Sequence, residues 1–443
     1  MRKTITVFEH EFLRVDKSDF TEAHFDRLVK HNEQHGNRFF SVGHRRIKFS
    51  QFVGVIQVDR LTIEVLPKVG KVAEEEKAKW RGVLVDMLHR VGCLKLHSLT
   101  AAHLRLRHAS LFEIYLESFI NEVRVLVHQG LTRKYRCDDG NLPVLKGRLV
   151  FSQHVNRNLV HRERFYTAHQ RYDRDNVFNR VLKQALAIVA RTRAGTHLAS
   201  SAKQLLLSFE DVTPAKARAE TFHRLRYCRN TERYKDAMTL AELIILNYVP
   251  DPQSGRRDVI AILFDMNDLF ERYVFAELSR AQRQFAEARL RVCGQRSQIF
   301  WHCNGMRKTI RPDIIAEFNA EGSARRLILD TKWKMPSDGR PSDADLKQMY
   351  TYNLQFGASE SYLVYPRAAA HDDVFGQFAA GPMQKEGTPH GCGTWFVDLL
   401  DGGRLDRRFG TRLCERIIST RTHEPATRQN ATHRQGSSPL EEC

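Results

Sequence analysis

The sequence contains no apolar run that approaches the length of a membrane-spanning helix, which needs about 18 uncharged residues. Its start, MRKTITVFEHEF, also lacks the apolar core of about 7–15 residues that marks a secretory signal. We therefore expect a cytoplasmic protein with no membrane partner.

Cysteine pairs and phosphate-binding loops are missing as well. The eight cysteines are scattered and none forms a C-x-x-C pair, which indicates reduced thiols rather than a disulfide scaffold or a zinc site near Cys303 or Cys392. Neither G-x-x-x-x-G-K-[ST] nor G-x-G-x-x-G occurs. If the protein takes part in a nucleotide-driven process, we expect another protein to bind the nucleotide.

Positive charge is what the sequence has in excess. Its 443 residues include 70 Lys and Arg against 52 Asp and Glu, a formal net charge of +18. This surplus indicates a polyanionic partner such as nucleic acid, although a solvated basic surface without a specific partner explains the charge equally well. The basic residues are spread along the chain rather than gathered in a tail, which favours a broad face or groove.

The spacing of apolar residues divides the chain into four parts and predicts an α+β multidomain fold. A β-rich N-terminal module is followed by a mainly helical middle region, a C-terminal α/β domain and a polar tail that we expect to be disordered. The four parts are residues 1–72, 73–255, 256–420 and 421–443.

Two local signals support this division. The alternation in Val55–Leu66 breaks at Asp59-Arg60, which predicts a strand, a turn and a second strand within a small antiparallel module. The segment Pro250–Asp258 holds two prolines and a Ser-Gly pair, so we place the boundary of the last domain there.

The last domain carries the candidate chemistry on two expected strands. In Arg326–Lys334, RLILDTKWK, the alternation places Asp330 and Lys332 on one face. An earlier strand is expected over about Ile310–Phe318, and NAEGSA between the two holds turn residues. If the strands pair across this turn, opposing residue numbers sum to 643 and Asp313 lies opposite Asp330.

Opposed carboxylates of this kind need a positive charge between them. Directly paired residues have Cβ atoms about 4.5–5.5 Å apart, so Asp313 and Asp330 repel one another. Mg²⁺ relieves such repulsion, since it binds one or two carboxylates together with water and phosphate oxygens. Lys332 can then orient or deprotonate a metal-bound water or stabilise phosphate charge, a set suited to phosphodiester hydrolysis. The alternative is a surface hairpin with a solvated Asp-Lys pair.

Two helices offer further candidate residues. One begins with Ser342 as N-cap and carries Gln348 and Tyr352 four residues apart on one face, directed at the strand-borne site, at a DNA phosphate or simply at solvent. The other is capped by Asp265 and carries Glu271 at the edge of its apolar stripe. Glu271 is either a third acidic ligand or a solvated helix acid.

The ordered set of motifs resembles the McrC family, the nuclease subunits of the modified-cytosine restriction system McrBC. The likeness is carried by FVGVIQVDRLTIEVLPKVG in the first half and, in this order, by FDMNDLFERYV, RPDIIAE, LILDTKWK and DLKQMYTYN in the second. It covers most of the chain but not the tail.

The resemblance implies a PD-(D/E)xK, restriction-endonuclease-like fold for the last domain. It implies that two acids bind Mg²⁺, that a lysine lies near the attacking water, and that a Q-x-x-x-Y element is present. These elements fall on Pro312, Asp313, Asp330 and Lys332, and on Gln348 and Tyr352.

The resemblance also implies a partner and a division of labour. The partner is McrB, a GTP-hydrolysing AAA+ motor that recognises modified DNA, into whose ring the N-terminal module docks to stimulate hydrolysis. Three functions follow as hypotheses: a Mg²⁺-dependent DNA endonuclease subunit of such a system, a non-catalytic adaptor that activates the motor and holds DNA, and a stand-alone DNA repair nuclease.

Overall fold

The computed structural model describes most of the chain in two compact units. The first contains the chain up to Ala276 with Asp398–Asp406, and the second contains Glu277–Pro366 with most of the remaining C-terminal part. The described residues are 3–16, 18–69, 76–94, 110–192, 196–249, 259–320, 322–334, 339–367, 371–379 and 389–420. Both Pro250–Asp258, the expected domain boundary, and the tail 421–443 lie outside them.

A five-stranded sheet organises the first part of the chain, in the order β1-β6-β5-β11-β10. The expected hairpin is confirmed, because β5 and β6 pair antiparallel and Asp59 takes a positive φ of 53° at the turn. The strands of this sheet are β1 (Lys3–Phe8), β5 (Phe52–Val58), β6 (Leu61–Leu66), β10 (Tyr248–Val249) and β11 (Val259–Asp265).

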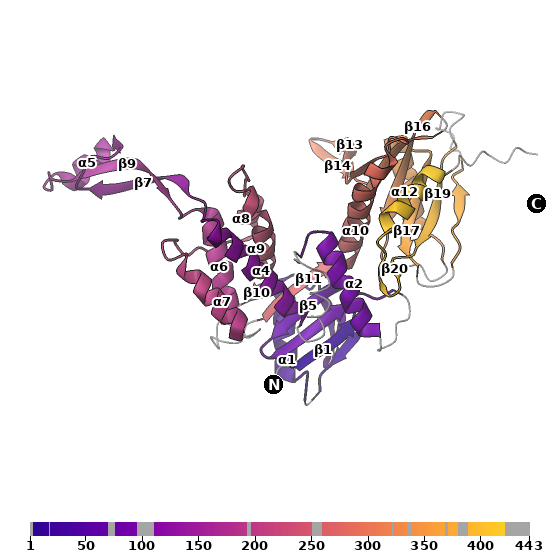
Figure 1. Cartoon of the computed structure of the whole chain (residues 1–443), viewed down its shortest axis with the longest axis horizontal. Helices are drawn as coiled ribbons and strands as arrows, with labels where there is room; N and C mark the ends of the chain where they lie inside the picture. The colour runs from indigo at the N-terminus through magenta and orange to yellow at the C-terminus, as the bar shows by residue number, and fades with distance from the viewer. Residues whose placement is uncertain are drawn as a thin grey trace, which may run out of the picture. The chain divides into compact units, whose positions relative to one another are not determined.

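Three features of this sheet differ from the expected antiparallel module. Strand β1 pairs with β6 in parallel, and the helix α1 (Glu22–Gln34) lies between strands of the module. Strand β11, expected in the last domain, completes the sheet beside β5 (Figure 1). A Cβ at Gly54 would lie 2.1 Å from the Ile262 carbonyl oxygen, so only glycine permits this close pairing.

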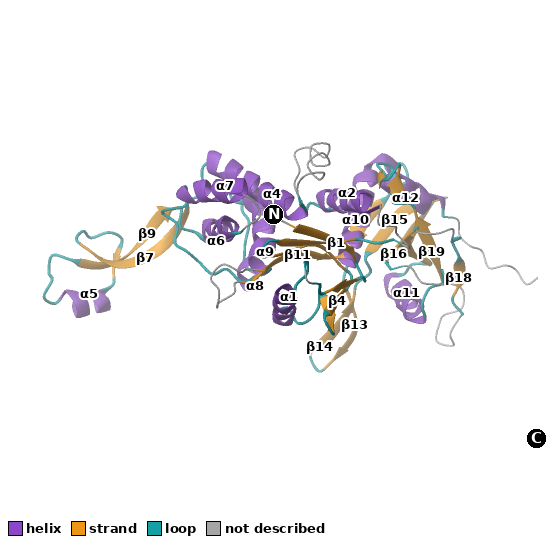
Figure 2. Cartoon of the chain, turned by 90° about the horizontal axis from the view of Figure 1, so that it is seen from below, coloured by secondary structure: helices purple, strands orange, loops and turns teal. Residues whose placement is uncertain are grey.

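Helices cover both faces of this sheet. Figure 2 shows α1 on one side and the helices α2 (Lys77–Arg90) and α4 (Leu111–His128) on the other. Leu28 of α1 packs in one hydrophobic core with Ile56 and Ala261 of the sheet. A smaller sheet in the order β2-β4-β3 extends the same core; its strands are β2 (Phe12–Arg14), β3 (Phe40–Gly43) and β4 (Arg46–Phe49).

The middle region is mainly helical, as the periodicity predicts. Helix α4 begins with a capping box of Ser110 and Glu113 and ends just before Gly130, whose φ is 84°. The other helices are α6 (Val177–Arg191), α7 (Thr196–Leu207), α8 (Ala219–His223) and α9 (Lys235–Leu246), with a 3₁₀ turn at Glu232–Tyr234.

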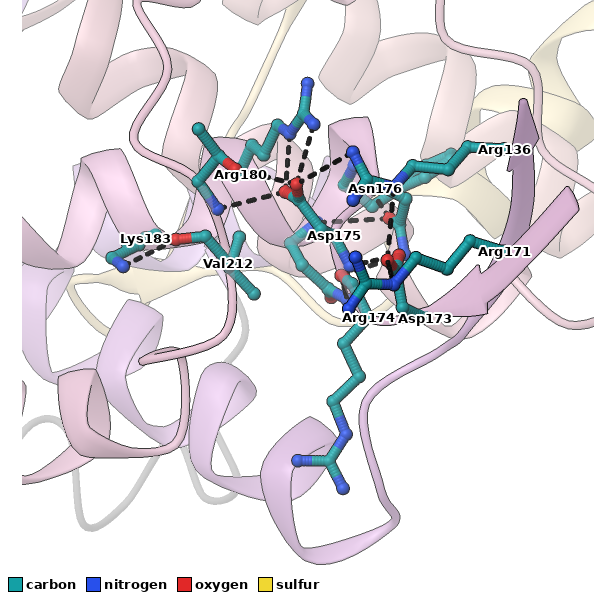
Figure 3. Close-up of polar contacts among 12 residues, drawn as sticks. Arg136, Arg171, Asp173, Arg174, Asp175, Asn176, Arg180, Lys183 and Val212 are labelled. Atoms are coloured by element: carbon teal, nitrogen blue, oxygen red, sulfur yellow. Dashed lines mark hydrogen bonds and ion pairs between the residues drawn. The ribbon is translucent and has the colours of Figure 1, made fainter. Parts of the chain in front are cut away.

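A three-stranded sheet interrupts these helices in the order β7-β9-β8 and projects away from them (Figure 1). Its elements are β7 (Lys134–Leu142), β8 (Arg148–Leu149), α5 (Phe151–Asn158) and β9 (Phe165–Asp173). Where β9 ends, the buried carboxylate of Asp175 accepts hydrogen bonds from Arg180 at 2.6 and 2.8 Å and forms an ion pair with Arg136 at 3.5 Å (Figure 3). These contacts fix the sheet to α6.

The second unit is built on a six-stranded sheet in the order β12-β15-β16-β17-β19-β18. Strands β16, β17 and β19 are parallel to one another, while β15 and β12 are antiparallel to their neighbours. The strands are β12 (Arg291–Gly294), β15 (Ile314–Ala320), β16 (Ser323–Thr331), β17 (Glu360–Pro366), β18 (Phe375–Gln377) and β19 (Gly391–Val397).

Several other elements complete the described chain. The long helix α10 (Met266–Ala281) runs from the first unit into the second, and the expected cap is present because Asp265 accepts a hydrogen bond from the Asn267 N–H at 2.9 Å. The remaining elements are a 3₁₀ turn at Gln282–Phe285, β13 (Gln298–Cys303), β14 (Met306–Ile310), α11 (Asp343–Phe356), β20 (Leu400–Asp401), β21 (Arg404–Leu405) and α12 (Phe409–Ser419). None of the described helices is both long and apolar enough to cross a membrane.

Candidate active site

The site is built on β16, a central strand of the second sheet. Leu327, Ile328 and Leu329 are fully buried, because β16 lies between β15 and β17 and is covered on both faces. Burial of each such side chain contributes about 1.5–3 kcal/mol, which fixes the strand and therefore the direction of the residues that follow. Asp330 comes next and is only 2% exposed, which excludes the solvated surface pair for this residue.

The register between β15 and β16 is the one that the sequence predicts. Ile314 pairs with Leu329 and Ala320 with Ser323, so every pair of numbers sums to 643. Asp313 directly precedes Ile314 and Asp330 directly follows Leu329, so the two acids lie at the same end of this ladder. The expected first strand was too long at its start, because Ile310 belongs to the separate strand β14.

Lys332 shares a face with Asp330, as alternation along the strand predicts. Its Nζ lies 2.8 Å from Asp330 Oδ2, 3.3 Å from Asp345 Oδ1 and 3.4 Å from Gln348 Oε1. An ammonium group has three N–H donors, and these three acceptors surround it. The Lys332 ammonium is therefore held next to Asp330, between β16 and α11.

Asp313 is positioned by the residue that lies between Asp330 and Lys332. Its Oδ2 accepts hydrogen bonds from the Thr331 N–H at 2.7 Å and from the Thr331 hydroxyl at 2.9 Å. Its own carbonyl accepts a hydrogen bond from the Gln295 N–H at 2.9 Å. The Oδ1 atom of Asp313 is not used in these bonds.

Helix α11 brings Gln348 and Tyr352 to the same place. The helix begins where the sequence predicts, since Ser342 accepts a hydrogen bond from the Asp345 N–H. Gln348 Nε2 donates to Asp330 Oδ1 at 3.2 Å and to Tyr352 Oη at 2.8 Å. The Tyr352 hydroxyl in turn donates to the Arg311 carbonyl at 3.1 Å, which ties the helix to the chain before Asp313.

Burial governs the protonation of this cluster. It raises the pKa of Asp313, and burial together with the charge of Asp313 raises the pKa of Asp330 to about 7. Burial acts in the opposite sense on Lys332, but Asp330 and Asp345 outweigh it and raise its pKa to about 12. Ionisation of both carboxyl groups at once is therefore unfavourable, and a cation bound between them would lower both pKa values.

The donor set fits a hard divalent cation. The buried Oδ2 of Asp330 forms an ion pair with Lys332 at 2.8 Å and has no other partner among the described residues, so a lone pair remains for a ligand. Two carboxylates are the usual protein contribution to a Mg²⁺ site that also uses water and phosphate oxygens. No group of three or more His, Cys, Asp or Glu side chains with metal-binding geometry occurs among the described residues, so an all-protein cage is not what this site offers.

The structure brings together five of the six predicted residues: Asp313, Asp330, Lys332, Gln348 and Tyr352. The sixth, Glu271, is half-buried on the part of α10 that belongs to the first unit, and its participation stays a prediction. Sequence reasoning missed Asp345 as a site residue because its place beside Ser342 is explained by capping. The signal was its spacing, since residues three apart on a helix share a face and Asp345 precedes Gln348 by three.

Comparison with known proteins points to one family. The family model described as "McrBC 5-methylcytosine restriction system component" matches residues 47–366, more than half of the chain. The "Type IV methyl-directed restriction enzyme EcoKMcrBC" of Escherichia coli (strain K12) is 20% identical over 215 residues, which are 47% of this chain and 60% of that protein. The chain therefore spans less than two thirds of this curated relative.

Two solved structures are also similar. One is a chain of the half-complex from a tetradecameric assembly of Thermococcus gammatolerans McrB AAA+ hexamers with bound McrC, which aligns with a TM-score of 0.64 and 21% identity over 94% of this chain and 100% of that chain. The other, from the Thermococcus gammatolerans McrBC complex, aligns with a TM-score of 0.48 and 23% identity over 63% of this chain and 88% of that chain. The first similarity shows a shared fold.

Proposed function

The chain belongs to the family of McrBC 5-methylcytosine restriction system components, and on that premise we propose that it is the Mg²⁺-dependent DNA endonuclease subunit of a modification-dependent restriction system. The observation that carries the proposal is the cluster of Asp313, Asp330 and Lys332 at the end of one buried strand pair. These residue types are the ones that the resemblance to PD-(D/E)xK nucleases implies, and their proximity supports the assignment.

Asp313 and Asp330 are the residues that would hold Mg²⁺. When bound, the cation supplies a Lewis acid that neutralises phosphodiester charge and makes a bound water more acidic. The protein holds both acids rigidly in place. Thr331 fixes Asp313 through two hydrogen bonds, and Gln348 and Lys332 fix the two oxygens of Asp330.

Lys332 supplies positive charge to the reacting phosphate. Asp330, Asp345 and Gln348 hold its ammonium beside the acid pair, where its charge would stabilise negative charge that develops during hydrolysis and help to orient the attacking water. Gln348 and Tyr352 are positioning residues, because they join Asp330 to the Arg311 carbonyl through consecutive hydrogen bonds.

The partner in this proposal is a GTP-hydrolysing AAA+ motor of the McrB kind, in the cytoplasm. The similar solved chain comes from McrB AAA+ hexamers with bound McrC, which supports a motor partner for this chain. The sequence contains no phosphate-binding loop, which supports a scheme in which the motor binds the nucleotide and this chain does not. Recognition of the modified base belongs to the partner in this scheme.

The adaptor hypothesis makes a different prediction for the same residues. A subunit that only activates the motor has no need of a buried acid pair, and buried charge is costly even when it is paired. Asp330→Asn separates the two functions because it keeps the side chain's size while removing its charge. We expect loss of DNA cleavage with intact stimulation of GTP hydrolysis, and continued cleavage by a purified Asp330→Asn protein would reject the nuclease assignment.

A further inference from the structure

Strands β13 and β14 form a two-stranded ribbon that lies outside the main sheet of the second unit. Ile299, Phe300, Trp301 and Met306 are between 45% and 61% exposed, although large apolar side chains are normally buried. Every residue of the ribbon except Ile310 is exposed, so neither face packs on a core. A two-stranded ribbon of this kind is only marginally stable in water by itself.

The ribbon and its flanks carry charge of a single sign. Residues 295–311, QRSQIFWHCNGMRKTIR, contain four Lys or Arg and no Asp or Glu. Within the described part of the chain, Arg296, Arg307 and Lys308 form no ion pair. This surface therefore offers uncompensated positive charge beside exposed rings.

The pairing of the two strands sets rings and cations side by side on both faces. Trp301 pairs with Lys308 and His302 with Arg307, and directly paired residues project from the same face. The two pairs are neighbours along the ribbon, so they occupy opposite faces. A register shift between Ile299 and Trp301 leaves Phe300 at a bulge.

Both ends of the ribbon are anchored at the catalytic acid. The Gln295 N–H, before β13, donates to the Asp313 carbonyl at 2.9 Å. After β14, the Arg311 carbonyl accepts the Tyr352 hydroxyl at 3.1 Å, two residues before Asp313. A ligand on the ribbon would therefore lie in a fixed relation to the proposed reaction centre.

We propose that the β13–β14 ribbon binds duplex DNA next to the phosphate that is cut, an inference that rests on the proposed function and adds the surface that positions its substrate. Arg307 and Lys308 contact backbone phosphates, and Trp301 packs against sugar or base. The major groove, about 12 Å wide, admits a two-stranded ribbon. Phosphate contacts of this kind set the register of a protein on the duplex.

A second copy of the chain fits the same surface less well. A symmetric contact places the same patch of both copies together. Two ribbons in such a contact would oppose four cations with four cations and no acid, which is unfavourable. DNA phosphates, in contrast, would be attracted to Lys308 on one face of the ribbon and to Arg307 on the other.

The test measures duplex binding by the full-length chain in EDTA, using fluorescence anisotropy over a range of salt concentrations. The double variant Arg307→Ala/Lys308→Ala is compared with Lys203→Ala/Arg283→Ala, which removes the same charge from two other exposed sites. Two lost phosphate contacts reduce the slope of log affinity against log salt by roughly 1.8, while the control keeps the wild-type slope.

A second pair of variants tests the contribution of the Trp301 side chain. Trp301→Ala is expected to weaken binding by about tenfold at each salt concentration without changing the slope, because the packing of a ring against sugar or base buries apolar surface and releases no counterions. Its control is Leu207→Ala, which truncates another exposed apolar residue (65% exposed). Unfolding temperatures equal to wild type confirm that the exposed substitutions leave the fold intact.

The outcomes separate this inference from the nuclease proposal. Ribbon variants that bind DNA like their controls, or a wild-type chain that binds no duplex, overturn the inference. Loss of self-association in sedimentation, with DNA binding unchanged, also overturns it and assigns the ribbon to a second copy. Cleavage by Asp330→Asn is assayed separately, so the nuclease proposal can fail while the ribbon's role in binding stands.

Discussion

The Oδ2 atom of Asp313 accepts two hydrogen bonds from Thr331, at 2.7 Å from its N–H and at 2.9 Å from its hydroxyl. The residue between Asp330 and Lys332 thus holds the acid from the neighbouring strand. One short segment at the end of β16 therefore supplies an acid, the group that positions the second acid, and an amine.

Thr331→Val removes the hydroxyl donor while keeping a β-branched side chain and the backbone bond. Because outer hydrogen bonds orient metal ligands, the Mg²⁺ concentration that gives half-maximal cleavage is expected to rise about tenfold. Thr331→Ser keeps the hydroxyl and is expected to behave like wild type. An unchanged Mg²⁺ requirement for the valine variant would show that Asp313 is held by other contacts.

Lys332 and Asp345 are expected to contribute unequally to cleavage. Lys332→Met removes the ammonium from the acid pair and is expected to slow single-turnover cleavage by about 100- to 1000-fold, as for loss of one electrostatic donor. Asp345→Asn leaves Lys332 beside Asp330 and Gln348, so we expect a much smaller loss. Equal effects of the two substitutions would contradict the role assigned to the amine.

Asp175 is expected to be essential for the stability of the first unit. Arg180 holds the pKa of this buried carboxyl well below its usual value, and Thr213 adds hydrogen bonds at 2.7 and 3.0 Å. Asp175→Asn leaves Arg180 without its charge partner and should cost about 3 kcal/mol in chemical unfolding. Glu232→Gln, which removes one exposed ion pair with Lys235, is the control and should cost no more than about 1 kcal/mol. Equal losses of unfolding free energy in the two variants would show that Asp175 has no special role in stability.

His31 is expected to make stability depend on pH. Burial, with the charge of His35, lowers its pKa to about 4, so the folded chain keeps His31 neutral while the unfolded chain binds a proton below about pH 6.5. Its stabilisation is therefore complete above pH 6.5 and decreases as pH falls toward 4, by roughly 3 kcal/mol in all. The measurement is the unfolding free energy of wild type and His31→Leu at several pH values. A slope that persists in the variant would assign the dependence to other groups.

The features that sequence could predict are those set by local pattern. The β15–β16 register followed from the alternation in RLILDTKWK and a short turn, and the Ser342 cap followed from residue type. Gln348 and Tyr352 were expected on one helical face because they are four residues apart. In each of these features, nearby residues in the chain are sufficient to decide the geometry.

The features that sequence missed depend on contacts between distant segments. Strand β11 joins the N-terminal sheet through residues about 200 positions away from β5, and no local pattern identifies its partner. Parallel pairing of β1 with β6 is non-local in the same way. The β13–β14 ribbon was missed because Ile310 continues the apolar pattern toward β15, although β14 ends at Ile310 and β15 begins only at Ile314.

Plasmid cleavage by the full-length chain with its AAA+ partner, GTP and Mg²⁺ tests the central claim most directly, when wild type is compared with Asp330→Asn on modified and unmodified DNA. The account predicts that wild type cuts modified plasmid, that EDTA abolishes cutting, and that Asp330→Asn leaves the plasmid intact while stimulating GTP hydrolysis as well as wild type. Cutting by Asp330→Asn at the wild-type rate would contradict it.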